Sequence, residues 1–174
     1  MSDNFVSLTS AGLFQKNTPI TVSAGASNAN QIFSTNSQGL IDTSFFSSTL
    51  GIPSISVNTS EAIAAGSLVN VYNNSGAANA RNANAATANQ AQIAVGYVNA
   101  AVASGAAATV LFAGIISGLT GLTIGAEYYL SDSNPGAVVT GYAPAVGHCL
   151  QSVGFALSTT SLLFLPRKPI VIAS

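Results

Sequence analysis

The sequence has 174 residues, and its four lysines and arginines against five aspartates and glutamates leave a net charge of −1 at pH 7. Charged residues make up 5% of the chain, whereas about 25% is usual for soluble domains. Four cations do not provide the basic surface that nucleic-acid binding requires. One cysteine and one histidine supply neither a disulfide framework nor a zinc site. We therefore expect no nucleic-acid partner and no metal. General acid–base chemistry is not excluded, although few groups could carry it, and we expect no cofactor and no small-molecule substrate.

The shortage of charge also bears on the protein's surface. Monomeric proteins stay soluble largely through surface charge, and a net charge of −1 gives little repulsion between molecules. The polar residues here are mostly Ser, Thr, Asn, Gln and Gly rather than Lys and Glu. We infer that neighbouring chains cover much of the surface, as in a homo-oligomer or a lattice component.

Residues 1–56 are rich in Ser, Asn, Thr and Gly, and the first residues have neither the basic nor the apolar stretch of a signal peptide. Short apolar groups interrupt this segment, but none is long enough for an amphipathic helix. We expect an extended N-terminal arm that covers its apolar groups only against the domain, a sister chain or another protein. The sequence Gly51-Ile52-Pro53 is typical of a turn or linker.

From Val57 onward, short apolar runs alternate with turn residues. Residues 68–72 alternate and end at the turn cluster 73–76, and residues 127–131 end at a turn that contains Pro135. Residues 77–91 read as a weak strand and then a loop, and the runs 92–102 and 109–116 as a hairpin. Further strands are expected at 138–140, 148–157, 161–165 and 170–172. A spacing of roughly 8–12 residues predicts an all-β sandwich or barrel of short antiparallel strands over 57–174.

The most apolar stretch, residues 98–116, resembles a membrane span only by its mean hydropathy. Much of that hydropathy comes from alanine, and Asn99, Ser104, Gly105 and Gly114 suit turns better than the centre of a helix. No Lys or Arg flanks the stretch closely, so the charge signal that orients a membrane helix is missing. We therefore expect no membrane partner.

Few residues are candidates for chemistry. His148 and Cys149 are neighbours, and neighbours in a strand point to opposite faces, so we do not expect them to form a nucleophile and base pair. The sequence contains no Gly-x-Ser-x-Gly motif and no Asp close to His148. Asp42, Glu127 and Asp132 do not form a calcium-binding loop. For Asp132 we expect a hydrogen bond within the Pro-Gly turn that it begins.

Two further pairs have structural interpretations. Tyr128 and Tyr129 are adjacent in a predicted strand, so one is expected in the core and the other at the surface or in an interface. Arg167 and Lys168 lie between two prolines, and we read them as solvated residues before the last strand. The Asn-x-Ser sequences at 58–60 and 73–75 are expected by chance in a chain so rich in Asn and Ser.

The second segment contains five sequence blocks whose order is informative: EAIAAGSLVNVY (61–72), AVGYV (94–98), ATVLFAG (108–114), GLTGLTIGAEYYLS (118–131) and GFALS (154–158). In this order they resemble tailed-bacteriophage head decoration proteins, also called capsid cement or head-fibre proteins. The resemblance covers about residues 57–173, and the block at 118–131 is its most specific part. The chain departs from the usual pattern at 80–85, where more charge would be expected.

The resemblance implies a β-rich, typically trimeric protein without catalysis that binds the outside of an icosahedral shell. The leading hypothesis is therefore a non-enzymatic virion protein, made in the host cytoplasm, that joins the capsid exterior as a homotrimer and binds the major capsid protein. Its arm would dock on the shell through Phe5, Leu8, Leu13 and Phe14. Ile41, Phe45 and Phe46 would contact sister chains in the trimer.

Two alternatives remain open at this stage. A tail-fibre module that binds a receptor or glycan would have the same β modules, and Tyr97, Tyr128 or Tyr142 exposed on one face would favour it. A hydrolase that uses His148 is the third reading, and replacement of His148 by Ala would test it.

Overall fold

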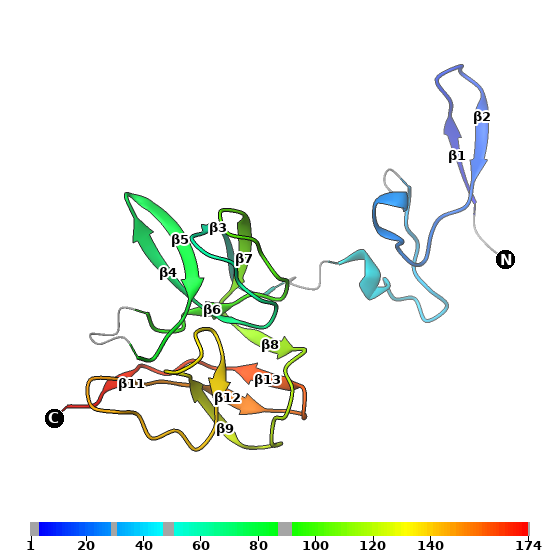
Figure 1. Cartoon of the computed structure of the whole chain (residues 1–174). Helices are drawn as coiled ribbons and strands as arrows, with labels where there is room; N and C mark the ends of the chain where they lie inside the picture. Colours follow the sequence, from blue (N-terminus) through cyan, green and yellow to red (C-terminus); the bar gives the residue numbers. More distant parts are fainter. Residues whose placement is uncertain (1–3, 29–30, 47–50, 87–91, 174) are drawn as a thin grey trace. The chain divides into compact units, whose positions relative to one another are not determined.

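A computed structural model describes residues 4–28, 31–46, 51–86 and 92–173, and the chain divides into two compact units, Met1–Gly51 and Ile52–Ser174. Figure 1 shows strands and short turns, and the helical segments among the described residues are two short 3₁₀ turns. The predicted all-β fold is thereby confirmed. The predicted domain boundary after residue 56 falls within the first strand of the second unit, β3 (Ser54–Thr59).

The N-terminal unit consists of a hairpin and irregular segments. Strands β1 (Phe5–Leu8) and β2 (Phe14–Asn17) pair antiparallel, and two 3₁₀ turns follow, η1 (Gly25–Asn28) and η2 (Thr43–Phe45). The Asp42 carboxylate caps η2 by accepting a 2.9 Å hydrogen bond from the Ser44 backbone N–H. No described residue of this unit is buried. The predicted extended arm is therefore partly folded, but it has no core of its own.

The second unit begins with a closed five-stranded barrel. Its strands, in order around the barrel, are β3, β5 (Ala77–Asn82), β4 (Leu68–Asn74), β6 (Gly96–Tyr97) and β7 (Ala107–Leu111). The β3–β5 pair is parallel and the other barrel pairs are antiparallel. The sequence predicted only antiparallel pairing. Because β4 and β5 are antiparallel to each other, the turn between them reverses the chain, and β5 then runs in the same direction as β3.

A five-stranded antiparallel sheet follows the barrel. Its order is β10 (Val138–Val139), β9 (Glu127–Leu130), β12 (Ser152–Ala156), β13 (Ser161–Phe164) and β8 (Gly114–Ser117). Strands β11 (Cys149–Leu150) and β14 (Ile170–Val171) form a separate pair. The predicted strand at 109–116 is divided between β7 in the barrel and β8 in the sheet. The predicted hairpin is reduced to one pair, Tyr97 with Leu111, because β7 pairs mainly with β3.

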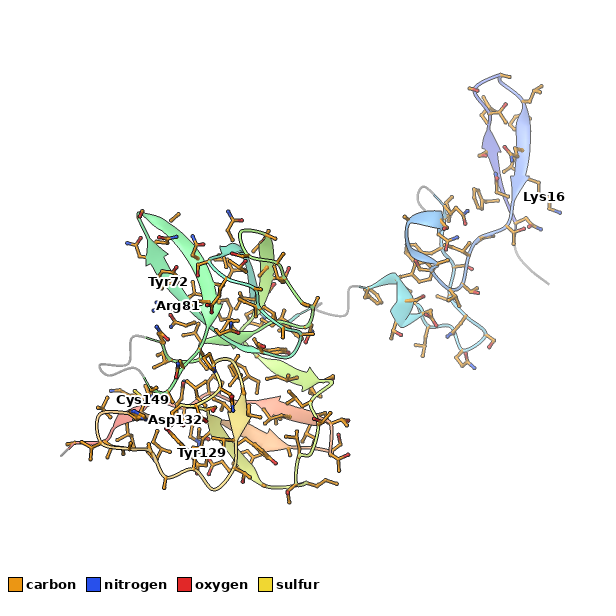
Figure 2. All side chains as sticks on the ribbon, viewed as in Figure 1. Lys16, Tyr72, Arg81, Tyr129, Asp132 and Cys149 are labelled. Atoms are coloured by element: carbon orange, nitrogen blue, oxygen red, sulfur yellow. The ribbon has the colours of Figure 1, made fainter. Side chains whose placement is uncertain are left out.

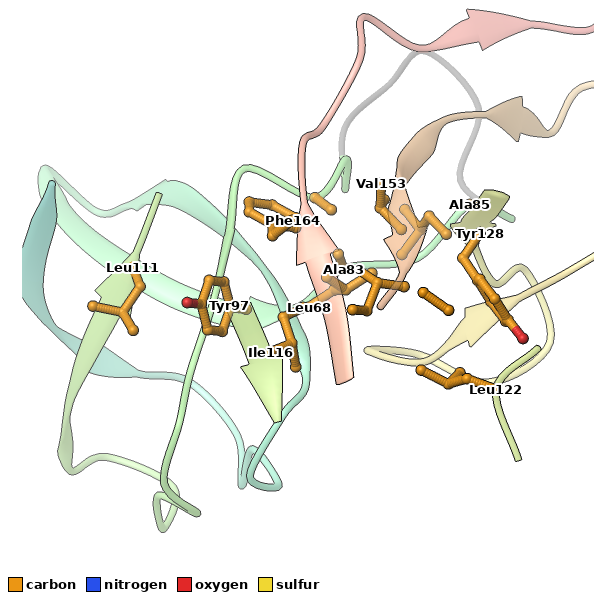
Figure 3. Packing of buried hydrophobic residues seen from close by; sticks show 14 of the residues in the cluster. Leu68, Ala83, Ala85, Tyr97, Leu111, Ile116, Leu122, Tyr128, Val153 and Phe164 are labelled. Atoms are coloured by element: carbon orange, nitrogen blue, oxygen red, sulfur yellow. The ribbon is translucent and has the colours of Figure 1, made fainter. Parts of the chain in front are cut away.

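One hydrophobic core joins the barrel to the sheet (Figure 3). Leu68, Tyr97 and Leu111 enter it from barrel strands, and Ile116 and Phe164 enter it from the sheet. The rings of Tyr97 and Phe164 meet edge to face, with their centroids 5.4 Å apart. A buried aliphatic or aromatic side chain contributes about 1.5–3 kcal/mol, so this core fixes the barrel and the sheet as one unit.

Gly154 shows how closely the sheet is packed. It lies at an irregularity in the register between β9 and β12 and has a φ of +147°. A Cβ atom at this position would come within 1.8 Å of the Leu163 carbonyl oxygen. Both the backbone conformation and the available space therefore require glycine here.

Candidate functional site

The β1–β2 hairpin has one apolar and one polar face. Its register pairs Leu8 with Phe14 and Val6 with Lys16, so these four side chains share one face. We call the three apolar residues among them, Val6, Leu8 and Phe14, the hairpin apolar face. The exposed fractions are 63% for Val6, 63% for Leu8 and 80% for Phe14. Large apolar side chains are rarely left this exposed in a contiguous group unless they form a contact surface.

The opposite face of the hairpin is polar and bonded within the chain. The Asn17 side-chain amide donates a 2.7 Å hydrogen bond to the Ser7 hydroxyl, and Gln15 lies opposite Ser7. Phe5 belongs to this second face, where it helps to line a surface depression together with Thr18 and Ile32. At the hairpin turn, the Leu13 N–H donates to the Thr9 hydroxyl at 3.1 Å.

The four residues predicted to bind the capsid are thus divided between different parts of the hairpin. Leu8 and Phe14 are cross-strand neighbours, and Leu13 lies beside them in the turn with its side chain exposed. Phe5 lies on the other face. The sequence reasoning missed Val6, although alternation along a strand would have grouped Val6 with Leu8 and separated both from Phe5.

The predicted trimer contacts lie in the second half of the N-terminal unit. Phe45 packs against Phe33 within the same chain, with ring centroids 5.4 Å apart. Ile41 and Phe46 keep part of their surface exposed. Their contact with sister chains stays a prediction.

His148 has an acidic neighbour that the sequence did not reveal. Its Nδ1 lies 2.9 Å from Oδ2 of Asp132, and both side chains are partly exposed. The hydrogen bond from His148 lowers the pKa of the Asp132 carboxyl, and the nearby Tyr142 hydroxyl lowers it further. Asp132 was expected to accept the hydrogen bonds of the turn. The Ser131 hydroxyl accepts them instead, from the backbone N–H groups of Ser133 and Asn134.

Among the described residues, the side chains next to this pair have structural positions of their own. Cys149 is buried in β11 (Figure 2), and the Ser131 hydroxyl accepts turn hydrogen bonds. The Tyr142 hydroxyl is buried without a hydrogen bond of good geometry, and burial raises the pKa of Tyr142. The described residues contain no group of three side chains suited to hold a metal ion.

Glu127 is the centre of a hydrogen-bond network on the sheet. Ser152 donates to Oε1 at 2.6 Å, and the Tyr129 hydroxyl donates to Oε2 at 2.9 Å. These two bonds, that of Ser152 first, lower the pKa of Glu127. Tyr128, by contrast, is buried, and its hydroxyl accepts a hydrogen bond from the Thr123 N–H. The prediction of one core tyrosine and one surface tyrosine is therefore confirmed.

The tyrosines do not form the exposed face that a glycan-binding module was expected to show. Tyr97 and Tyr128 are both buried in the core, and only part of Tyr142 is accessible. In the part of the chain that the structure describes, no helix is long and apolar enough to cross a membrane.

Comparisons with known proteins give one structural neighbour. No family model matches the chain, and no curated protein matches it. Among solved structures, the head fiber gp8.5 N base of bacteriophage phi29 matches over 66% of this chain and 94% of its own length, at 12% sequence identity and a TM-score of 0.41.

Proposed function

We propose that the chain is a structural protein of a bacteriophage virion that attaches to the outside of the capsid and decorates or reinforces it. The major capsid protein is its binding partner, and the N-terminal unit makes the attachment. Three copies of the chain form one decoration. The protein is made in the host cytoplasm, and it has no catalytic role.

The observation that carries this proposal is the hairpin apolar face. A two-stranded hairpin is only marginally stable by itself, and Val6, Leu8 and Phe14 gain little from folding because they stay exposed. Contact with a partner would bury them, at about 1.5–3 kcal/mol for each large apolar side chain. The second unit has its own core, whereas no described residue of the N-terminal unit is buried.

Attachment through a small hairpin is effective when several copies act together. One hairpin buries too little surface for tight binding by itself. Joining three hairpins in one particle makes the second and third contacts intramolecular, which raises avidity by orders of magnitude without new contacts. This is the physical reason to expect an oligomer.

A binding assay with capsid shells tests the proposal. Shells that lack this protein are mixed with the full chain, with a chain that lacks residues 1–30, and with Leu8→Ser/Phe14→Ser. We expect the full chain to sediment with the shells and both altered chains to stay in solution. Leu40→Ser is the matched control, because Leu40 and Leu8 are both 63% exposed and Leu40 lies outside the hairpin. Normal binding of the truncated chain would assign the attachment to another part of the molecule.

A further inference from the structure

The five-stranded sheet covers the core with one side and leaves its other side open. Tyr128, Leu130, Leu162 and Phe164 point into the core. The alternate residues point away from it, and the register places Glu127, Phe155, Leu163 and Ile115 in one row across β9, β12, β13 and β8. Leu157 and Leu165 flank this row and are exposed. We call the apolar residues Ile115, Phe155, Leu157, Leu163 and Leu165 the outer sheet face.

Charged groups of both signs lie at the β9 end of this row. Glu127 and Tyr129 line a shallow depression together with Arg167 and Lys168. The backbone N–H of Arg167 donates a 2.9 Å hydrogen bond to the Ser152 carbonyl. This bond holds residues 167 and 168 beside the Glu127 network. Lys168 is exposed, and it has no ion pair among the described residues. Three of the chain's nine charged side chains therefore lie beside one apolar face.

The Glu127 network suits a surface that becomes covered. Both carboxylate oxygens already accept hydrogen bonds from Ser152 and Tyr129. Removing water from a charged group costs less free energy when the group already has hydrogen bonds within its own chain than when water provides them. Lys168 has no such internal ion pair among the described residues, so an anion on the partner would stabilise its contact.

These charges decide which partner fits. A purely acidic partner would leave Glu127 facing like charge, and a purely basic one would leave Lys168 doing so. A second copy of this chain carries an apolar face of the same size together with charges of both signs, the anion Glu127 and the cations Arg167 and Lys168. It would also cover surface in a chain of which only 5% of residues are charged.

We propose that the outer sheet face is an interface between copies of this chain, with Ile115, Phe155 and Leu163 at its centre and Lys168 of one copy against Glu127 of another. This inference rests on the self-association in the proposed function, to which it assigns a surface. That surface lies outside the N-terminal segment from which the trimer contacts Ile41, Phe45 and Phe46 were predicted.

The test is the mass of the full chain in solution, measured by sedimentation equilibrium over a range of concentrations. We expect the unaltered chain to sediment as a multiple of 17.3 kDa. Ile115→Asn and Leu163→Asn should raise the dissociation constant by about tenfold or more, since 1.4 kcal/mol corresponds to a factor of ten. Lys168→Glu should weaken association by a smaller factor than the two Asn variants. Its effect should be larger at low salt than at high salt, because salt screens exposed charges.

Ile55→Asn is the matched control, because both isoleucines lie in strands with similar exposure. Ile55 is 40% exposed on barrel strand β3, and Ile115 is 49% exposed on β8. Circular dichroism and a melting curve establish that each variant folds. Ile115→Ala, a milder change, replaces any variant that does not fold.

The outcomes separate this inference from the proposed function. If the unaltered chain assembles, and the Ile115, Leu163 and Lys168 variants assemble equally well, the assigned surface alone is wrong. If the unaltered chain stays monomeric at high concentration, both the surface and the three-copy assembly are wrong. Shell binding, measured separately, decides the attachment role in either case.

Discussion

The two units of the chain use similar apolar residues in opposite ways. In the second unit, Phe164 and Leu162 are fully buried and hold the sheet against the barrel. In the N-terminal unit, Phe14 and Leu8 occupy a regular hairpin but remain exposed, and no described residue there is buried. The same chemistry stabilises the fold in one unit and is left available for contact in the other. Stability and attachment are therefore expected to respond to different substitutions.

Paired glycine substitutions give the largest expected difference between the units. Gly154 and Gly39 both have positive φ, but a Cβ at Gly154 would come within 1.8 Å of a carbonyl oxygen, whereas nothing lies within 4 Å of one at Gly39. We expect Gly154→Ala to prevent folding of the second unit or to destabilise it by more than about 4 kcal/mol. Gly39→Ala carries only backbone strain of about 1 kcal/mol. Urea denaturation followed by circular dichroism measures both.

An equal loss of stability in the two glycine variants would contradict this comparison, since strain at positive φ would then account for both. Gly39→Ala also serves as the control for expression, because it changes the same atoms as Gly154→Ala.

Two phenylalanines provide the second test. Phe164→Ala removes a ring that packs on Tyr97 in the core, and we expect a loss of about 3–5 kcal/mol in the free energy of unfolding. Phe14→Ala removes an exposed ring and should change that free energy by less than about 0.5 kcal/mol. The denaturation midpoints of the two variants give the comparison directly.

Shell binding should reverse the ranking of the two phenylalanine variants. Phe14→Ala is expected to lose shell binding while its unfolding transition is retained. If Phe14→Ala lowered stability as much as Phe164→Ala, the hairpin would belong to a core, and its role as an exposed contact surface would be wrong.

The local features of the second unit were predictable because they depend on neighbouring residues. The short run 127–131, followed by an Asp-Ser-Asn-Pro-Gly turn, predicted both strand β9 and its end. The same reasoning predicted that one of Tyr128 and Tyr129 lies in the core and the other at the surface or in an interface. These predictions need only the period of a strand and the conformations that Pro and Gly favour.

Pairing between distant segments was not predictable in the same way. β7 pairs with β3 across about half the unit, and the β3–β5 contact is parallel; neither has a local signal, because the shared core decides which strands meet. The hairpin β1–β2 was missed because each strand has only four residues. The contact of Asp132 with His148 depends on how two loops meet and has no sequence motif.

The smallest expected effect concerns the Asp132–His148 pair, which has no counterpart in the N-terminal unit among the described residues. Because the folded-state pKa of Asp132 is lowered, its contribution to stability is complete above the unfolded pKa of about 4 and is lost as the pH falls through the lower folded value. We expect Asp132→Asn to cost at most about 1 kcal/mol near pH 6, as for other partly exposed pairs. The difference from the unaltered chain should shrink below about pH 4, where protonation removes the same charge.

Urea midpoints of both proteins from pH 6 to pH 2.5 measure this difference. Asp42→Asn is the control, since the Asp42 carboxylate caps a turn of the N-terminal unit and its replacement should leave the transition of the second unit unchanged. A difference between Asp132→Asn and the unaltered chain that stays constant down to pH 2.5 would show that the substitution acts through packing rather than through the charge of the carboxylate.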